Sequence, residues 1–254
     1  MLNQFDVNDR VVLITGSSRG LGFEFAKGFV EAGAKVILNG INKGRLESSV
    51  AALQKYQTNI FGYPFDVTDS IAVKQAIESI ETDIGPIDIL INNAGIHRRS
   101  PLSEMTMDDW KTVMDTNLNA VFYISQCVAN RMKERKKGKI INITSLNAVG
   151  VRPTIANYCA AKGGLTLLTK SLATEYGPFG IQTNAIGPGY FLTDLTQPLA
   201  DDPEFDAWVK KEVPLARWGK PEELIGSALF LASDASSYVN GHTIYVDGGW
   251  QACL

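Results

Sequence analysis

The chain has 254 residues, with 27 acidic and 24 basic side chains and a formal net charge of −3. This charge gives no electrostatic reason to expect nucleic acid or an anionic membrane as a partner. Apolar residues make up 45% of the chain and charged residues 20%, which is typical of a globular protein and excludes a disordered one. We expect a single domain over residues 1–254.

The compartment is predicted from the cysteines and the apolar runs. Cys127, Cys159 and Cys253 form an odd set without metal-type spacing, which favours a reducing compartment. The N-terminus lacks a secretion signal, and no apolar run approaches the ~18 residues that cross a bilayer. We therefore expect a cytoplasmic protein with no nucleic-acid or membrane partner.

Short apolar runs alternate with longer amphipathic ones along the chain. Strands are predicted at Val11–Thr15, Lys35–Asn39, Ile60–Phe65, Ile87–Ile91, Lys139–Thr144, Ile181–Ile186 and Thr243–Val246. Helices are predicted at Leu21–Ala32, Lys43–Lys55, Ser70–Asp83, Met107–Glu134, Ala156–Tyr176 and Pro221–Ala232. Strands rich in β-branched residues and separated by helices indicate a parallel sheet covered on both faces. The sequence therefore predicts a doubly wound α/β fold of the Rossmann type.

One segment departs from this alternation. Gly187–Pro214 is rich in Pro, Asp and Thr and contains one short predicted helix, Pro203–Lys211. Long irregular insertions in a compact domain often form lids or binding loops. We expect this segment, residues 187–214, to cover the substrate.

A glycine-rich turn follows the first predicted strand and precedes a helix. Glycines let the backbone approach a pyrophosphate closely, and a helix N-terminus offers free N–H groups to it. The spacing differs from the common G-x-G-x-x-G pattern, but the position at the first strand-to-helix turn favours a nucleotide site. The residues expected to contact the cofactor here are Gly16, Ser18, Arg19, Gly20, Leu21 and Gly22.

The end of the second strand selects between NAD and NADP, because an acidic residue there binds the ribose diol and basic residues accept a 2′-phosphate. Asn39 and Gly40 stand at this position, and no carboxylate occurs before Glu47. Arg19 lies in the neighbouring turn. We predict a preference for NADP(H); the alternative is that Arg19 and Lys43 are merely exposed and NAD(H) is accepted as well.

Further cofactor contacts are expected where later strands end. Asp66, followed by Val67, bonds the adenine edge or, as the alternative, caps a turn. The small residues Asn93, Ala94 and Gly95 let the chain pass beneath the nucleotide. Pro188, Gly189 and Thr193 follow the sixth strand and would close the carboxamide side.

Tyr158, Lys162 and Ser145 form the candidate catalytic set. A phenol is a poor acid at neutral pH, with a reference pKa of about 10. Lys162 lies four residues after Tyr158 on a predicted helix, so its ammonium group can favour the phenolate. The hydroxyl of Ser145 can hold the oxygen that Tyr158 protonates or deprotonates. The tyrosine–lysine spacing alone is weak support, because a surface tyrosine with a solvated neighbour has it too.

These motifs together resemble the short-chain dehydrogenase/reductase family over nearly the whole chain. The resemblance rests on Thr15-Gly16-x-x-x-Gly20-x-Gly22, Asn92-Asn93-Ala94-Gly95, Asn117, Ser145, Tyr158-x-x-x-Lys162 and Pro188-Gly189. It implies a sheet of seven parallel strands and a homotetramer. It also implies Tyr158 as the general acid and base, Ser145 as the partner of the substrate oxygen, Lys162 on the nicotinamide ribose and Asn117 as the holder of a relay water.

The substrate is predicted less directly. Arg98 and Arg99 follow the Asn-Asn-Ala-Gly motif and suit a carboxylate; the alternative is a surface or subunit contact. The stretch resembles the branch of the family that interconverts D-gluconate and 5-keto-D-gluconate, which implies a sugar acid or keto acid as substrate. Tyr190 and Asn147 are expected beside it, although the residues around Asn147 depart from that branch.

Two other functions stay open at this point. One is a reductase of 3-oxoacyl or other carbonyl compounds, including another keto acid or polyol. The other is a nucleotide-sensing protein that binds the cofactor without catalysis, against which the complete set of Asn117, Ser145, Tyr158 and Lys162 speaks.

Overall fold

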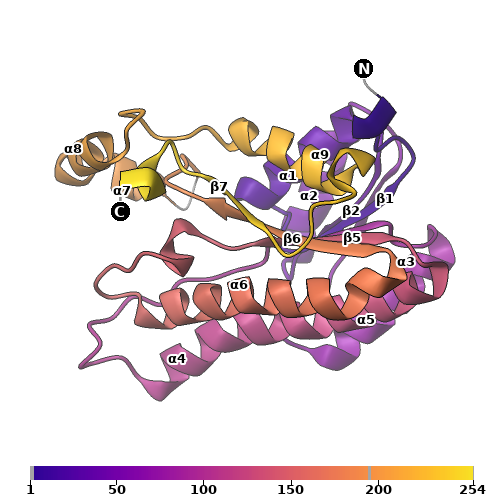
Figure 1. Cartoon of the computed structure of the whole chain (residues 1–254), viewed down its shortest axis with the longest axis horizontal. Helices are drawn as coiled ribbons and strands as arrows, with labels where there is room; N and C mark the ends of the chain where they lie inside the picture. Colours follow the sequence, from indigo (N-terminus) through magenta and orange to yellow (C-terminus); the bar gives the residue numbers. More distant parts are fainter. Residues whose placement is uncertain (1–2, 194–195, 254) are drawn as a thin grey trace.

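The computed structural model describes residues 3–193 and 196–253. Within them, seven parallel strands form one sheet in the order β3-β2-β1-β4-β5-β6-β7 (Figure 1). The strands are β1 (Val11–Ile14), β2 (Lys35–Asn39), β3 (Ile60–Tyr63), β4 (Ile89–Asn92), β5 (Gly138–Ile143), β6 (Ile181–Pro188) and β7 (Thr243–Val246). The strand order changes direction between β1 and β4, and such a switch point forms a crevice for ligands at the carboxyl ends of the strands.

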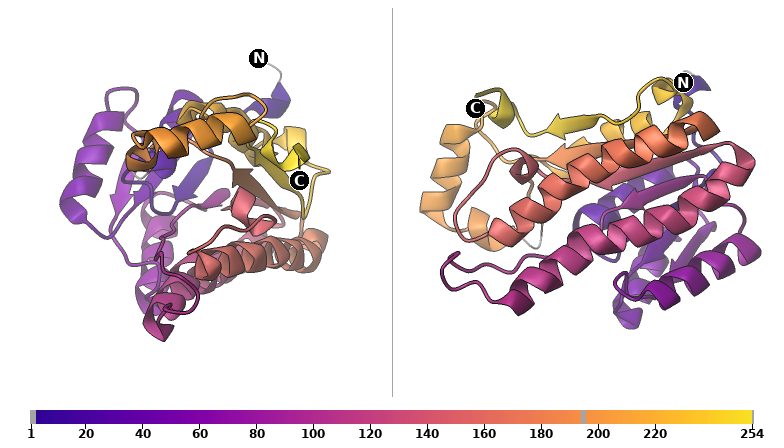
Figure 2. Two further views of the ribbon diagram at one scale, coloured as in Figure 1. Left: turned by 90° about the vertical axis from the view of Figure 1, so that its left-hand side faces the viewer. Right: turned by 60° about the horizontal axis from the view of Figure 1, so that its bottom comes forward.

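Helices cover both faces of the sheet (Figures 1 and 2). They are α1 (Gly20–Glu31), α2 (Lys43–Leu53), α3 (Ser70–Asp83), α4 (Met107–Met114), α5 (Ala120–Arg135), α6 (Ala156–Tyr176), α7 (Gln197–Ala200), α8 (Pro203–Glu212) and α9 (Ile225–Ala232). Helices α1, α2 and α9 lie on one face, and α3, α5 and α6 on the other. Short 3₁₀ helices occur at Asn3–Phe5, Leu146–Ala148, Gly177–Phe179, Pro221–Leu224, Asp234–Ser236 and Trp250–Cys253. The predicted doubly wound fold is confirmed.

The prediction of one helix over Met107–Glu134 is wrong. A π-helical stretch, Asp115–Asn119, separates α4 from α5, and the N–H of Ala120 bonds the carbonyl of Asp115, five residues earlier. Apolar spacing does not reveal this break, because the residues on either side keep a helical pattern. The helix predicted at Pro221–Ala232 differs as well, because its first four residues form a 3₁₀ helix.

The irregular segment predicted from Gly187 begins two residues later, because β6 continues through Pro188. Its expected helix is α8, and α7 precedes it. Both lie beyond the carboxyl end of β6, on the left of Figure 1. Residues 194 and 195 of this segment lie outside the described part of the chain.

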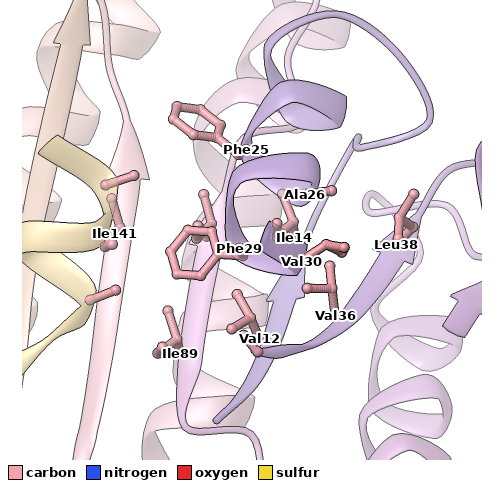
Figure 3. Close-up of a cluster of buried hydrophobic side chains, with 14 of the residues drawn as sticks. Val12, Ile14, Phe25, Ala26, Phe29, Val30, Val36, Leu38, Ile89 and Ile141 are labelled. Atoms are coloured by element: carbon pink, nitrogen blue, oxygen red, sulfur yellow. The ribbon is translucent and has the colours of Figure 1, made fainter. Parts of the chain in front are cut away.

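The core between the sheet and α1 is continuous and apolar. Val12 and Ile14 of β1 point toward Phe25 and Phe29 of α1 (Figure 3). Both rings are buried. Because both faces of a parallel sheet are covered, β1 reads as an unbroken apolar run rather than an alternating one. No helix in the described residues is long and apolar enough to span a membrane.

We predict that Phe29→Ala lowers the free energy of unfolding by about 3–5 kcal/mol, because it leaves a cavity under a rigid sheet. Tyr56→Ala is the matched control: this ring is 57% exposed, so its removal changes stability by about 0.5 kcal/mol or less. Urea unfolding measures both, and equal losses would contradict this account of the core.

Candidate functional site

The turn after β1 is fixed to the turn after β4. Asn93 Nδ2 donates to the carbonyls of Thr15 and Gly16, each at 3.0 Å. A Cβ atom at Gly16 would lie 2.8 Å from Ala94 Cα, and one at Gly22 would collide with Asn93 Nδ2. Gly16 also has φ +60°, which favours glycine. The two glycines and Asn93 therefore hold one strand-end turn against the other.

Asn39 supports the same turn from β2. Its Oδ1 accepts from the N–H of Gly16 at 3.1 Å, and its Nδ2 donates to the carbonyl of Phe65 at 3.0 Å. The side chain is buried. Gly40 follows, where a Cβ would lie 2.9 Å from Ser18 Oγ. Asn39 thus shapes the cofactor turn from within, and Gly40 makes room for Ser18.

A pocket of about 380 Å³ opens beside the glycine turn and α2. Its lining includes the predicted Ser18, Arg19, Gly20 and Thr193. Neither Arg19 nor Arg45, which also lines it, forms an ion pair within the described residues. Two unpaired guanidinium groups in a pocket at a glycine turn fit the 2′-phosphate of NADP.

Arg45 was missed by the sequence prediction, which considered Lys43 instead. Asn42 caps α2 by accepting from the N–H of Arg45. The lining residues of α2 are Arg45, Ser48, Ser49 and Ala52, a spacing of three, four and seven residues that marks one helix face. That spacing, counted from the Asn42 cap, was the available signal.

Other predicted cofactor residues occupy structural positions. Asp66 Oδ1 accepts from the N–H of Thr68 at 2.9 Å and from its hydroxyl at 2.8 Å, which is the turn-capping alternative. The side chain of Val67 is buried in the core, and Leu21 packs against the core. The N–H of Gly189, after Pro188, bonds the carbonyl of Val246. The side chains of Val67 and Leu21 therefore serve packing, and the Gly189 N–H serves the pairing of β6 with β7.

Ser145 and Tyr158 meet at the carboxyl end of β5. The hydroxyl of Ser145 hydrogen-bonds the phenol of Tyr158, which lowers the pKa of that phenol. Burial has the larger and opposite effect and raises the pKa of Tyr158 to about 12. Ser145 Oγ also accepts from the N–H of Asn147 at 3.1 Å. At neutral pH the tyrosine is therefore protonated, as a proton donor must be.

Lys162 lies one helical turn after Tyr158, as predicted. Its Nζ donates to the carbonyl of Ile143 at 2.7 Å and lies 5.8 Å from the centre of the Tyr158 ring. Burial lowers the pKa of Lys162 to about 8. The expected lowering of the Tyr158 pKa by Lys162 does not appear in this geometry, because the ammonium group is directed at the Ile143 carbonyl. Burial is the largest effect on the pKa of Tyr158.

Asn117 sits in the π-helical stretch and closes on the β4 turn. Its Oδ1 accepts from the N–H of Ile96 at 2.8 Å, and its Nδ2 donates to the Ile96 carbonyl at 2.9 Å. A Cβ at Gly95 would lie 3.4 Å from Asn117 Oδ1 and 3.8 Å from Lys162 Nζ. The four predicted catalytic residues are thus brought together, with the side chain of Asn117 engaged by the backbone of Ile96.

His97 was not predicted to act in catalysis, yet it packs on the catalytic tyrosine. Its ring stacks on Tyr158 with centroids 3.8 Å apart and planes inclined by 25°. Burial, with the charges of Arg99 and Lys162, lowers the pKa of His97 to about 4, so the imidazole is neutral at neutral pH. Within the described residues, its Nδ1 and the Oδ1 of Asn147 are buried without a hydrogen-bond partner.

The two arginines predicted to bind the substrate differ in their ion pairing. Arg98 Nη1 lies 3.9 Å from Asp109 Oδ1, whereas Arg99 forms no ion pair among the described residues. The positive charge of Arg99 acts on His97 and Tyr190. Of the two, Arg99 is therefore the one turned toward the catalytic set.

Tyr190 belongs to an aromatic cluster of the substrate-covering segment. Its ring meets those of Phe205, Trp208 and Trp218 edge-on, with centroids 6.0, 5.6 and 5.8 Å away. Its hydroxyl accepts from Arg152 Nη1 at 3.0 Å. Arg152, in the loop between β5 and α6, was missed by the sequence prediction, and no local motif marks it.

Comparison with known proteins gives consistent matches. A family model described as enoyl-(acyl carrier protein) reductase matches residues 16–251. A gluconate 5-dehydrogenase of Gluconobacter oxydans (strain 621H) is 48% identical over 96% of each chain. A 2-dehydro-3-deoxy-D-gluconate 5-dehydrogenase of Formosa agariphila is 46% identical over 98% of this chain and 96% of its own. The structure of a gluconate 5-dehydrogenase from Burkholderia cenocepacia J2315 in complex with NADP and tartrate has a TM-score of 0.96 and 43% identity, and covers 100% of this chain and 99% of that one.

A glycine turn at the switch point of a parallel sheet, beside a buried serine–tyrosine–lysine set, defines an oxidoreductase that acts on CH–OH groups with NAD(P). The chain belongs to the short-chain dehydrogenase/reductase family. The resemblance predicted from its motifs, including that to gluconate 5-dehydrogenases, is confirmed.

We predict that Tyr158→Phe lowers kcat by at least about 10²–10⁴-fold, because the proton donor is lost, and leaves cofactor affinity nearly unchanged. Steady-state kinetics and quenching of tryptophan fluorescence by NADPH measure the two effects. Tyr63→Phe is the matched control, since that phenol bonds Asp83 on the far edge of the sheet. Substantial activity of the Tyr158 variant would refute the assignment.

We predict that Arg45→Gln and Arg19→Gln each raise KM for NADPH about tenfold or more, by loss of a charge-assisted hydrogen bond, and change KM for NADH little. Lys43→Gln serves as the control, because Lys43 does not line the pocket. An equal loss with both cofactors would show that these arginines do not read the 2′-phosphate.

Proposed function

We propose that this enzyme is an NADP(H)-dependent dehydrogenase of sugar acids, which interconverts D-gluconate and 5-keto-D-gluconate. Four buried polar atoms lack hydrogen-bond partners within the described residues: Asn92 Oδ1, His97 Nδ1, Asn147 Oδ1 and Thr183 Oγ1. The observation that carries the substrate class is that two of them, His97 Nδ1 and Asn147 Oδ1, belong to residues next to the candidate catalytic set. They lie beside Tyr158 and Ser145, respectively. Buried acceptors need donors, and a polyol supplies hydroxyl donors next to the reacting carbon, which a 3-oxoacyl chain does not.

The relatives support this substrate class. The Gluconobacter enzyme is named for gluconate, and the Burkholderia structure contains NADP and tartrate, a hydroxylated dicarboxylate. Arg99, exposed and without an ion-pair partner among the described residues, supplies a positive charge near the catalytic set. Anionic polyols therefore suit this site better than neutral ketones do.

In the reducing direction, Tyr158 donates its proton to the substrate oxygen while hydride arrives at the carbon. The glycine turn would hold the pyrophosphate of the cofactor, and Lys162 and the turn after β4 would hold its nicotinamide half, which would supply the hydride. Ser145 holds the same oxygen by its hydroxyl, so charge on that oxygen is stabilised as it develops. In the oxidising direction Tyr158 would accept the alcohol proton as a phenolate, and the hydrogen of the C–H bond would leave with its electron pair, as hydride, to the oxidised cofactor.

Lys162 and Asn117 would connect Tyr158 to solvent protons. The ammonium group of Lys162 favours the phenolate electrostatically once it turns toward it. The side chain of Asn117 is occupied by Ile96, so we assign the relay water to its main-chain carbonyl. The π-helical stretch supports this assignment, because bonds between residues five apart alter the carbonyl pairing of a normal helix.

A second candidate substrate is 2-dehydro-3-deoxy-D-gluconate, for which the Formosa relative is named. It shares a carboxylate and a polyol chain with gluconate, so the same arginine and acceptors suit it. The similarity of 46% against 48% does not separate the two.

The decisive experiment follows reduced-nicotinamide absorbance with each cofactor across D-gluconate, 5-keto-D-gluconate, 2-dehydro-3-deoxy-D-gluconate and a 3-oxoacyl thioester. We predict the highest kcat/KM for the gluconate pair with NADP(H). A higher kcat/KM for 2-dehydro-3-deoxy-D-gluconate would make that acid the substrate and would leave the substrate class, sugar acids, unchanged. A higher value for the thioester, or NADPH binding without any turnover, would overturn the proposal.

We also propose that the enzyme is a homotetramer in the cytoplasm, formed from a single domain with residues 187–214 over the substrate. The apolar side chains of Phe122 and Tyr123 on α5 and Leu167 on α6 are exposed in the single chain and support self-association. Cys127, Cys159 and Cys253 are free thiols, which suits a reducing compartment.

A further inference from the structure

Arg152 connects the loop after β5 to the substrate-covering segment. Its Nη1 donates to the hydroxyl of Tyr190 at 3.0 Å. Its guanidinium carbon lies 4.4 Å from the centre of the Trp208 ring and 4.7 Å from that of Phe205. The loop between β5 and α6 and the helices α7 and α8 lie at the same end of the molecule, at the left of Figure 1. This end carries the carboxyl ends of the strands and hence the catalytic set.

The charge of Arg152 has no counterion within the described residues. Arg98 and Arg217 are paired with Asp109 and Glu223, whereas Arg152, like Arg19, Arg45 and Arg99, forms no ion pair among those residues. Arg152 is half-buried and is held instead by rings and a phenol. A guanidinium group has five N–H donors in a fixed plane, so stacking on aromatic rings orients the plane and leaves donors for a ligand. A partly desolvated cation in neutral surroundings attracts an anion.

Arg152 also shares an electrostatic neighbour, Tyr190, with Arg99. Arg99 acts in turn on His97, which stacks on Tyr158. A substrate with its reacting carbon at Tyr158 and an anionic group further along the same chain would reach between these two arginines. D-gluconate has this form, with a carboxylate at C1 and the reacting alcohol at C5.

We propose that Arg152 binds the carboxylate of the sugar-acid substrate and that Tyr190 orients its guanidinium group for this contact. Arg152 therefore determines specificity for acids over neutral polyols. The identity of the acid rests on the proposed function, whereas the binding of a carboxylate at Arg152 does not.

The test compares D-gluconate with D-gluconamide, its neutral counterpart of nearly equal shape, as substrates with NADP⁺. We expect Arg152→Gln to lower kcat/KM for gluconate about 10- to 100-fold, mainly through KM, because a charge-assisted hydrogen bond is lost. For gluconamide the change should be below about threefold, since that substrate has no charge to lose. Arg152→Lys, which keeps the charge without the planar fork, should fall between these values.

Two further variants separate substrate binding from a structural role. Tyr190→Phe removes the hydroxyl partner and keeps the ring, and should shift the gluconate-to-gluconamide ratio in the same direction by a smaller factor. Arg131→Gln removes the same charge from α5, where Arg131 pairs with Glu78 and Glu81, and should leave the ratio unchanged. If Arg152 only braces the segment, both substrates lose activity equally and the ratio stays constant, which overturns the proposal. The Tyr190 variant decides the question if Arg152→Gln does not fold.

Calorimetric titration of tartrate into the enzyme with NADP⁺ distinguishes failure of this inference from failure of the proposed function. Suppose that wild type does not oxidise gluconate, but that Arg152→Gln binds tartrate about tenfold or more weakly than wild type does. The proposed substrate is then wrong, and the carboxylate site at Arg152 is supported. If wild type oxidises gluconate and Arg152→Gln keeps both the gluconate-to-gluconamide ratio and the tartrate affinity, the proposed function stands and the carboxylate site at Arg152 is overturned. If wild type neither oxidises gluconate nor binds tartrate, both proposals fail.

Discussion

The hydrogen bonds between the turn after β1 and the turn after β4 set the geometry of everything else at the site. Thr15 Oγ1 accepts from the N–H groups of Asn93 and Ala94, and Asn93 Nδ2 returns two bonds to the first turn. These strands flank the point where the strand order changes direction, so the bonds fix the crevice in which ligands bind. Asn39 of β2 is positioned against the first of these turns. Asn117 of the π-helical stretch is positioned against the second, through its hydrogen bond to Ile96.

Burial has the largest effect on the pKa values of Tyr158 and Lys162. It raises the pKa of Tyr158 to about 12 and lowers that of Lys162 to about 8. Removal of water opposes both charged forms, so the phenol is kept as an acid and the lysine charge becomes sensitive to its partners. A small movement of the ammonium group from Ile143 toward Tyr158 would then change the proton affinity of the phenol more than it would in water.

Polar groups without partners mark the substrate side of the site. Unpartnered polar atoms of His97 and Asn147 lie beside Tyr158 and Ser145, and the charges of Arg99 and Arg152 act on Tyr190. Such a distribution suits a ligand with hydroxyl groups at one end and a negative charge at the other. The aromatic cluster around Tyr190 packs against the guanidinium group of Arg152, and the Tyr190 hydroxyl accepts a hydrogen bond from it, so the group is held in one orientation.

The sequence by itself determined the doubly wound fold, because strand and helix periods and the glycine turn are local signals. It likewise predicted Ser145, Tyr158 and Lys162 as one set, since Ser145 lies just after β5 and Tyr158 and Lys162 lie four residues apart on the helix after it. Three-dimensional contacts, in contrast, determine that Arg98 pairs with Asp109 while Arg99 and Arg152 have no ion-pair partner among the described residues. They also determine that Arg45 lines the cofactor pocket and that a π-helical stretch interrupts α4 and α5. The reason is physical: which charge is neutralised, and which side chain is turned inward, depends on partners distant in the chain.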